Sequence, residues 1–215
     1  LEKLSTFNPK VGYPDRWRGY AGLVVKPGDA AGNTLRATRF ASARDWAEAG
    51  KLVDRARWGM NPQVVNAYYN PLGNEIVFPA AILRPPFFDL HGDDAFNYGA
   101  IGAVIGHEIS HGFDDQGRQY DADGFLRDWW QAADAKTFDA RTAKLVAQYA
   151  AYEPLPGTHV DGKLTLGENI ADLAGVSMAL RAYERSLHGR PAAVIDGRTG
   201  RQRFYFGYAR VWRSK

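Results

Sequence analysis

The feature that most constrains this chain is the pentapeptide His107-Glu108-Ile109-Ser110-His111. Side chains four residues apart lie one turn from each other on the same face of a helix, so both imidazoles can bind one metal ion only if the segment is helical. The glutamate between them can then face a water molecule on that ion and act as a general base. The alternative is a pair of core histidines on a buried helix. The pattern predicts a helix and favours a zinc site on it.

The chain has no cysteine, so a metal ion can bind only to histidine, aspartate or glutamate. Zinc in a catalytic site takes three protein ligands and leaves one position open for water. Glu168 is the best candidate for the third ligand, because it shares a helical face with Asp172 in the segment 167–172. Thr165 and Glu168 also fit a capping box, in which the glutamate bonds to the backbone. The residues alone leave both interpretations open.

Composition indicates one globular domain and argues against several functions. The 215 residues are 45% hydrophobic and 24% charged, which is ordinary for a protein with a buried core. The net charge of +3, without a stripe of Lys or Arg, argues against nucleic-acid binding. No apolar run reaches the length of a membrane span. The chain begins with Leu1 rather than Met, so we expect a fragment whose missing targeting signals say little.

The hydrophobic periodicity predicts an α+β fold, mostly α, with a small sheet that contains a hairpin. Residues 1–40 are expected to form an irregular lead-in. Turn-forming residues at 70–74 separate two runs of β type and predict the hairpin. The expected strands are 64–69 and 75–78, and the expected helices are 42–58, 97–113, 126–152, 165–187 and 204–212.

Four segments resemble the neprilysin and endothelin-converting-enzyme family of zinc endopeptidases. They are 66–71 (NAYYNP), 107–115 (HEISHGFDD), 167–172 (GENIAD) and Val211-Trp212. Their order and spacing are similar to those of the family, and the likeness covers nearly the whole chain. The resemblance implies a thermolysin-like zincin catalytic domain over residues 1–215, and it favours metal binding over capping for Glu168.

The resemblance also implies roles in the zinc site and in catalysis. One zinc ion per chain would bind to His107, His111 and Glu168. Glu108 would activate a water molecule for attack on the peptide carbonyl and pass its proton to the leaving amine, with Asp172 as the second catalytic residue. Asp172 would orient His107 and Asp114 would orient His111, because a carboxylate on the other ring nitrogen fixes the tautomer.

Two further groups match the family's substrate-binding residues. Asn66 and Ala67 match an edge strand along which an extended peptide would bind, and an ordinary sheet strand is the alternative. Five apolar residues match a pocket for the residue after the scissile bond, and core packing is their alternative: Ile82, Phe87, Val104, Val211 and Trp212. The family position matching Ala103 is often larger, which implies a roomier pocket here.

The chain departs from the family at both ends. The resemblance implies that two parts of the family lie outside this chain: a large helical domain before the catalytic part, and a C-terminal segment with a histidine and an arginine that stabilise the oxyanion. Losing one oxyanion donor typically costs about 100- to 1,000-fold in turnover. We therefore expect this chain alone to bind zinc but to cleave peptides weakly or not at all. Apolar surface left exposed by the absent parts is expected to favour self-association.

The sequence thus predicts a zinc-dependent endopeptidase that acts on short peptides. The resemblance favours an extracytoplasmic location, periplasmic or secreted. One alternative is a non-catalytic, zinc-stabilised module that binds peptides, but structural zinc needs no general base such as Glu108. The other is a zinc hydrolase of a non-peptide substrate, which the edge strand at Asn66 and Ala67 disfavours.

Overall fold

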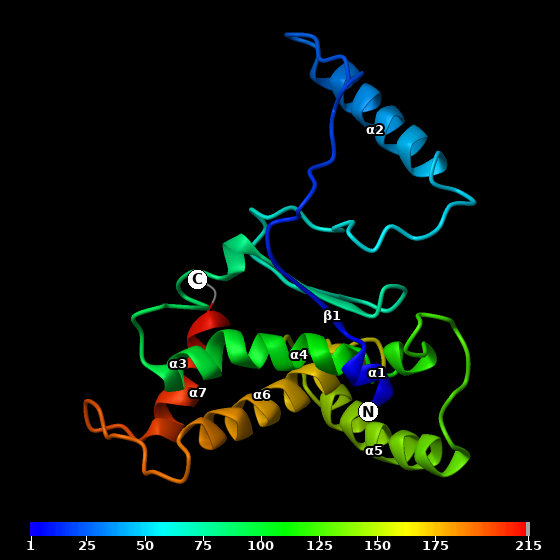
Figure 1. Cartoon of the computed structure of the whole chain (residues 1–215). Coiled ribbons are helices and arrows are strands. Elements are labelled where there is room, and N and C mark those ends of the chain that lie inside the picture. The colour runs from blue at the N-terminus through cyan, green and yellow to red at the C-terminus, as the bar shows by residue number, and fades with distance from the viewer. Residues whose placement is uncertain (214–215) are drawn as a thin grey trace. The chain divides into compact units, whose positions relative to one another are not determined.

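The computed structural model describes residues 1–213, so Ser214 and Lys215, which end the expected domain, lie outside the described residues. The chain forms two compact units. The first, Leu1–Tyr13 with Gly59–Lys215, holds a three-stranded sheet and most of the helices. The second, Pro14–Trp58, holds α2 (Ala30–Trp46). The prediction of an α+β fold, mostly α with a small sheet, is confirmed (Figure 1).

The sheet combines the predicted hairpin with a strand from the N-terminus. Its strand order is β1 (Asn8–Gly12), β3 (Glu75–Pro79) and β2 (Tyr68–Asn70). β1 is parallel and β2 antiparallel to the central β3, which is buried along its whole length. The hairpin is therefore confirmed, although β2 begins later than the expected strand 64–69. β2 is an edge strand, hydrogen-bonded within the sheet only to β3.

The irregular lead-in expected at residues 1–40 is wrong at both of its ends, whereas residues 13–29 contain no helix or strand. The first residues form α1 (Glu2–Ser5) and β1, and residues 30–40 belong to α2. β1 contains Pro9 and shows no clean alternation of apolar and polar side chains, so nothing local marks it as a strand. Its partner β3 is distant in the sequence, and local periodicity does not report such pairing.

The helix expected at 42–58 is also wrong, because α2 ends at Trp46. α2 starts at a cap that the apolar spacing did not reveal: the side chain of Asp29 accepts a hydrogen bond from the backbone N–H of Gly32 at 3.0 Å. The apolar side chains that suggested a buried helical face are instead exposed: Trp46, Leu52 and Val53.

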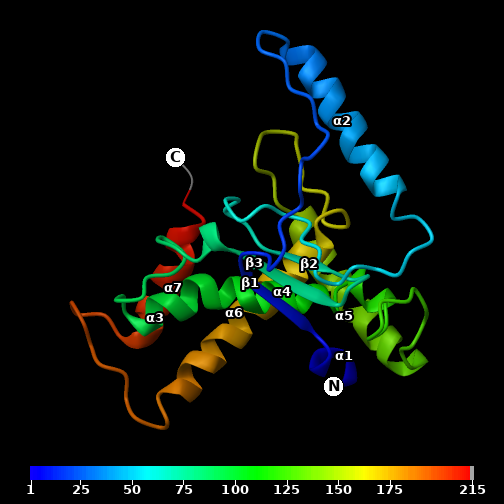
Figure 2. The same ribbon diagram turned by 45° about the horizontal axis from the view of Figure 1, so that its top comes forward.

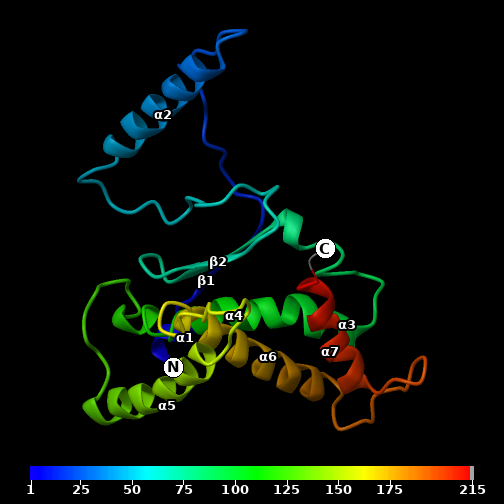
Figure 3. The ribbon, with the colours of Figure 1, turned by 180° about the vertical axis from the view of Figure 1, so that it is seen from behind.

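In the first unit, a long interrupted helix runs beneath the sheet. It consists of α3 (Asp94–Asn97), a π-helical turn (Tyr98–Gly102) and α4 (Ala103–His111). The sheet lies on one side of α4 and α6 (Leu166–Ser186) on the other, as Figures 1 and 3 show. Figure 2 shows the strands passing over α4.

Two further helices complete this unit. α7 (Gly200–Val211) packs across α3 and the π-helical turn, and α5 (Ala132–Ala150) packs against α6. The predicted helices at 97–113, 165–187 and 204–212 are thus confirmed apart from their ends. α5 begins at Ala132 rather than at 126, because the preceding residues form a loop closed by a bridge between Tyr120 and Leu126.

Two apolar clusters fix the long helix from opposite sides. The first cluster lies between the sheet and the helix: Ala67, Ile76, Phe78, Ile82, Ile101 and Val104. The second joins the helix to α6 and α7: Ala95, Ala103, Ala179, Tyr183 and Phe204. Because α4 contributes neighbouring residues to both clusters, its rotation about its own axis is determined. Among residues 1–213, no helix is long and apolar enough to span a membrane.

Candidate metal centre

Three side chains from two helices converge on one point. His107 and His111 lie one turn apart on α4, and their Nε2 atoms are 2.9 Å from each other. Glu168, in the first turn of α6, places Oε2 3.3 Å from Nε2 of His107 and 3.6 Å from Nε2 of His111. The structure thus brings together all three side chains that the sequence nominated as ligands.

These separations suit a zinc ion. Tetrahedral zinc, with bonds of about 2.0–2.1 Å, holds its ligand atoms about 3.3 Å apart. Each histidine faces a carboxylate through Nδ1, and a carboxylate only accepts, so Nδ1 carries the proton and Nε2 presents its lone pair. Two lone pairs that face each other at 2.9 Å repel unless a cation lies between them. The donor set and its spacing therefore fit zinc, with one coordination position left for water or substrate.

Two aspartates hold the imidazoles in this orientation. His107 donates through Nδ1 to Asp172 Oδ1 at 2.8 Å, and His111 donates through Nδ1 to Asp114 Oδ2 at 2.7 Å. Burial lowers the pKa of His111, but the hydrogen bond and the charge of Asp114, together with the charges of Glu108 and Glu168, outweigh it and leave that pKa raised. Asp114 is itself 4% exposed.

The second oxygen of Asp114 is also occupied. Asp114 Oδ1 accepts hydrogen bonds from the backbone N–H groups of Gln116, at 2.9 Å, and Gly117, at 2.7 Å. The loop after α4 therefore wraps around this carboxylate. The orientation of His111 thus depends on the conformation of that loop as well as on α4.

The capping-box interpretation of Glu168 is wrong. Thr165 precedes α6, but its side chain makes no capping hydrogen bond. Its hydroxyl instead donates to the carbonyl of Asp161 and accepts from the side chain of Asn169. Glu168 is consequently free to face the two histidines. A complete capping box does occur in the chain, between Thr199 and Gln202 at the start of α7.

Glu108 is a buried carboxylate at the same cleft as the two histidines. Its side chain lines that cleft, yet the residue is only 5% exposed. Burial raises the pKa of Glu108, and the neighbouring His107 and His111 partly oppose that rise.

The cleft at this centre has a volume of about 400 Å³ and runs along β2. Asn66 and Ala67, the predicted substrate residues, line it together with the metal-binding side chains. A second hollow of about 530 Å³ adjoins it at His111 and Glu168 and is lined by Asp161 and Lys163. Sequence reasoning had no signal for Lys163, because the loop that presents it carries no motif.

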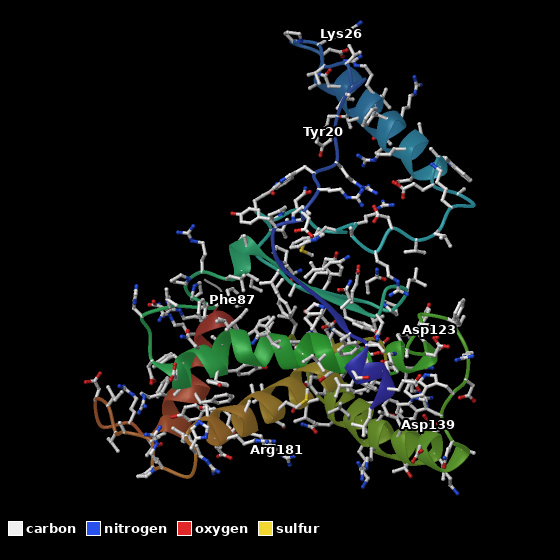
Figure 4. The ribbon with its side chains drawn as sticks, in the orientation of Figure 1. Tyr20, Lys26, Phe87, Asp123, Asp139 and Arg181 are labelled. Atoms are coloured by element: carbon white, nitrogen blue, oxygen red, sulfur yellow. The ribbon has the colours of Figure 1, made fainter. Side chains whose placement is uncertain are left out.

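The five apolar residues predicted for a substrate pocket do not line this cleft. Ile82 and Val104 are buried in the first apolar cluster, and Phe87 packs against that cluster. Figure 4 shows Phe87 toward the α3 end of the long helix, whereas Asp123 lies past its other end. Val211 and the exposed Trp212 lie at the end of α7. Packing therefore accounts for Ile82, Val104 and Phe87, but not for Val211 and Trp212.

Glycines bring the two metal-binding helices into backbone contact. Gly106 on α4 lies against Gly175 on α6, directly beside His107. A Cβ added at Gly175 would lie 2.6 Å from the backbone nitrogen of His107 and 2.7 Å from the carbonyl oxygen of Ala103. Glu168 and Asp172 are two turns and one turn before Gly175 on the same face of α6. This close crossing therefore sets their distance from His107.

We expect Gly175→Ala to destabilise the protein by about 1–3 kcal/mol, because the new methyl group meets backbone that cannot turn aside. Zinc affinity should fall as well, because α6 carries Glu168 and Asp172 away from α4. Denaturant unfolding and zinc competition measure the two effects. Ser177→Ala, on an exposed face of α6, is the matched control. Equal stability and affinity in both variants would show that the close crossing is not required.

The fold and the site together define the class of metallopeptidase centres in which a helical His-Glu-x-x-His motif is joined by a glutamate from a second helix. The chain belongs to peptidase family M13, whose family model matches residues 66–215. It is 36% identical to neprilysin-3 of Drosophila melanogaster over an alignment of 225 positions, which covers 100% of this chain and 28% of that protein. It is 44% identical to human endothelin-converting enzyme 1 over 188 residues, which is 85% of this chain and 24% of that protein.

Solved structures give the same assignment. An inhibitor complex of the zinc metalloprotease Zmp1 of Mycobacterium tuberculosis superposes with a TM-score of 0.97 at 56% identity, over 100% of this chain and 34% of that one. PepO of Lactobacillus rhamnosis superposes with a TM-score of 0.84 at 39% identity, over 98% of this chain and 32% of that one. The chain thus spans about a third of the length of these neighbours. These neighbours support the expected thermolysin-like zincin fold.

Proposed function

We propose that the protein is a zinc-dependent endopeptidase that hydrolyses short peptides. The observation that carries this proposal is a buried carboxylate, Glu108, placed between two metal-binding histidines at a cleft bordered by an edge strand. A general base, a metal site and a peptide-binding strand in one cleft are what peptide hydrolysis requires.

Each residue of the centre would have a separate role in hydrolysis. His107, His111 and Glu168 would hold a zinc ion, which would supply Lewis acidity for the water and the scissile carbonyl. Glu108 takes the proton from the attacking water and returns it to the leaving amine. Its raised pKa suits both steps, since a carboxylate of higher pKa is a better base and gives a group able to donate afterwards. Asp114 and Asp172 keep Nδ1 of each histidine protonated.

The substrate would lie along β2 as an added strand. Asn66 is exposed and Ala67 is buried where the chain enters β2, and both line the cleft. Ile82 and Val104 share an apolar cluster with Ala67, and we propose that they support the strand from behind. Phe87, Val211 and Trp212 remain proposed contacts for a substrate side chain. We also keep the proposals of an extracytoplasmic location and of self-association through exposed apolar side chains.

Two alternative functions predict different results for zinc binding and peptide cleavage. A zinc-stabilised module that only binds peptides would retain zinc and peptide affinity without turnover. A zinc hydrolase of another substrate would lose activity on chelation but would not cleave peptides. The burial of Glu108 favours a catalytic role, because a carboxylate withdrawn from water at a cost in free energy is hard to explain in a purely structural site.

The test is peptide cleavage with and without metal. Internally quenched peptides should be cleaved by the longest natural form of the protein, and this 215-residue chain should cleave them weakly or not at all. A chelator should reduce the rate to the uncatalysed background, and one equivalent of zinc should restore it. Folded proteins should not be cleaved. Peptide cleavage that continues undiminished in a chelator would rule the proposal out.

A further inference from the structure

Lys3 is buried in a position where a charged side chain needs a specific reason. The residue is 2% exposed. Its Nζ donates hydrogen bonds of 2.7 Å to three carbonyl oxygens, those of Gly112, Gly117 and Tyr120. An ammonium group has three N–H donors and no acceptor, so its hydrogen-bonding capacity is fully used.

Aromatic rings complete the surroundings of this ammonium group. Its Nζ lies 5.8 Å from the ring centroid of Tyr69, 5.6 Å from that of Phe113 and 5.8 Å from that of Trp129. Rings at such distances attract a cation through their quadrupoles. Burial lowers the pKa of Lys3 to about 8, with Asp114 and Asp121 acting in the opposite direction. Lys3 therefore remains mostly protonated at neutral pH.

The carbonyls that bind Lys3 belong to the loop that orients a metal-binding histidine. Gly112 directly follows His111 at the end of α4. The N–H of Gly117 donates to Asp114 Oδ1 at 2.7 Å, and Asp114 Oδ2 binds Nδ1 of His111. Lys3 thus binds the carbonyl of Gly117, and Asp114 binds its N–H. Figure 1 shows α1, which carries Lys3, beside the His111 end of α4.

Lys3 is itself anchored to the β2–β3 hairpin. The side chain of Asn74, in the turn, donates to the carbonyl of Lys3 at 2.9 Å and to the hydroxyl of Thr6 at 3.0 Å. The hydroxyl of Tyr69 donates to the side-chain oxygen of Asn74. The backbone of Lys3 is therefore fixed to the sheet while its ammonium group holds the loop after α4.

We infer that Lys3 is a positioning residue of the metal centre. Its ammonium group closes the loop 112–120, and the loop fixes Asp114, which fixes the imidazole of His111. Lys3 lies outside the residues 66–215 that the family model matches, and it touches none of the three metal-binding side chains. The inference rests on the proposed zinc site, and it extends the machinery of that site to the first residues of the chain.

The experiment compares zinc binding by the wild type and by Lys3→Met, which keeps an apolar stem but removes the charge and the donors. We expect the zinc dissociation constant to rise about tenfold, as is typical when the partner of a ligand histidine is disturbed. Chelator competition with zinc alone measures it. Absorption of the cobalt-substituted protein should change in its visible bands, because these report the geometry of the ligands.

Two controls separate positioning from general destabilisation. Phe204→Leu weakens the second apolar cluster, away from the loop, and should lower the melting temperature without changing zinc affinity or the cobalt spectrum. Lys3→Gln keeps two N–H donors on a shorter stem and should give a smaller loss of affinity. It also provides a folded variant where Lys3→Met folds poorly.

The outcomes are distinct. A wild type that binds no zinc would contradict the proposed metal centre itself. A wild type that binds zinc, with unchanged affinity and cobalt spectra in both Lys3 variants, would overturn the positioning role alone. If Phe204→Leu lost as much zinc affinity as Lys3→Met, the positioning role would also be overturned, because a general loss of stability would then explain both results.

Discussion

Replacing Glu108 by glutamine should reduce peptide cleavage by roughly 100- to 10,000-fold, the range in which general acid–base catalysis contributes. The amide has nearly the same shape as the carboxylate but cannot accept the proton of the attacking water. Zinc should stay bound, because Glu108 is not among the three converging ligands. The measurements are kcat/KM on a short peptide with the longest natural form of the protein, and the zinc content of each variant.

The matched control is Glu184→Gln, the same change near the far end of α6, where Glu184 pairs with Arg201. It should leave activity unchanged. Cleavage that survives in Glu108→Gln would contradict the proposed mechanism. Loss of both zinc and activity would instead mean that Glu108 supports the metal site.

Replacing either His107 or Glu168 by alanine should weaken zinc binding on the order of 1,000-fold, because each change removes one of three protein ligands. The wild type should bind about one zinc ion per chain. Metal analysis after dialysis, with chelator competition for the dissociation constants, tests this. His91→Ala, at an exposed histidine outside the cluster, should keep its zinc. Full zinc retention in both ligand variants would refute the site.

In the absence of metal, Glu168→Ala and His107→Ala should have different melting temperatures. Glu168 is 70% exposed at its side chain, so Glu168→Ala should melt close to the metal-free wild type. His107 is 14% exposed at its side chain and binds Asp172, so His107→Ala leaves a cavity and removes a hydrogen bond. Its metal-free form should therefore melt at a lower temperature. This comparison separates loss of a ligand from loss of structure.

Much of the metal centre could be predicted because its signals are local. The spacing of His107 and His111 is a property of one helical turn, and Glu168 and Asp172 share a face of one helix. The sequence could not decide between capping and metal binding for Glu168, since both use the same residue types at the same spacing. The structure excludes capping, because the side chain of Thr165 is hydrogen-bonded to Asp161 and Asn169 instead.

The parts that were missed depend on distant partners. β1 becomes a strand only beside β3, and the ammonium group of Lys3 finds its acceptors in the loop after α4. Neither segment has a periodicity that indicates its role. The five apolar residues illustrate a different limit. Core packing and a substrate pocket select the same side chains, so composition alone could not show that Ile82 and Val104 are buried in a cluster.

The contacts of Lys3 also bear on the order in which this protein assembles. The three carbonyls that receive its ammonium group follow Lys3 in the sequence by 109, 114 and 117 residues. β1 likewise waits for β3. Contacts between such distant segments form late, because the entropy of closing the intervening chain must be overcome first. We therefore expect the surroundings of His111 to be completed late in folding, when α1 docks beside the helix that carries the histidines.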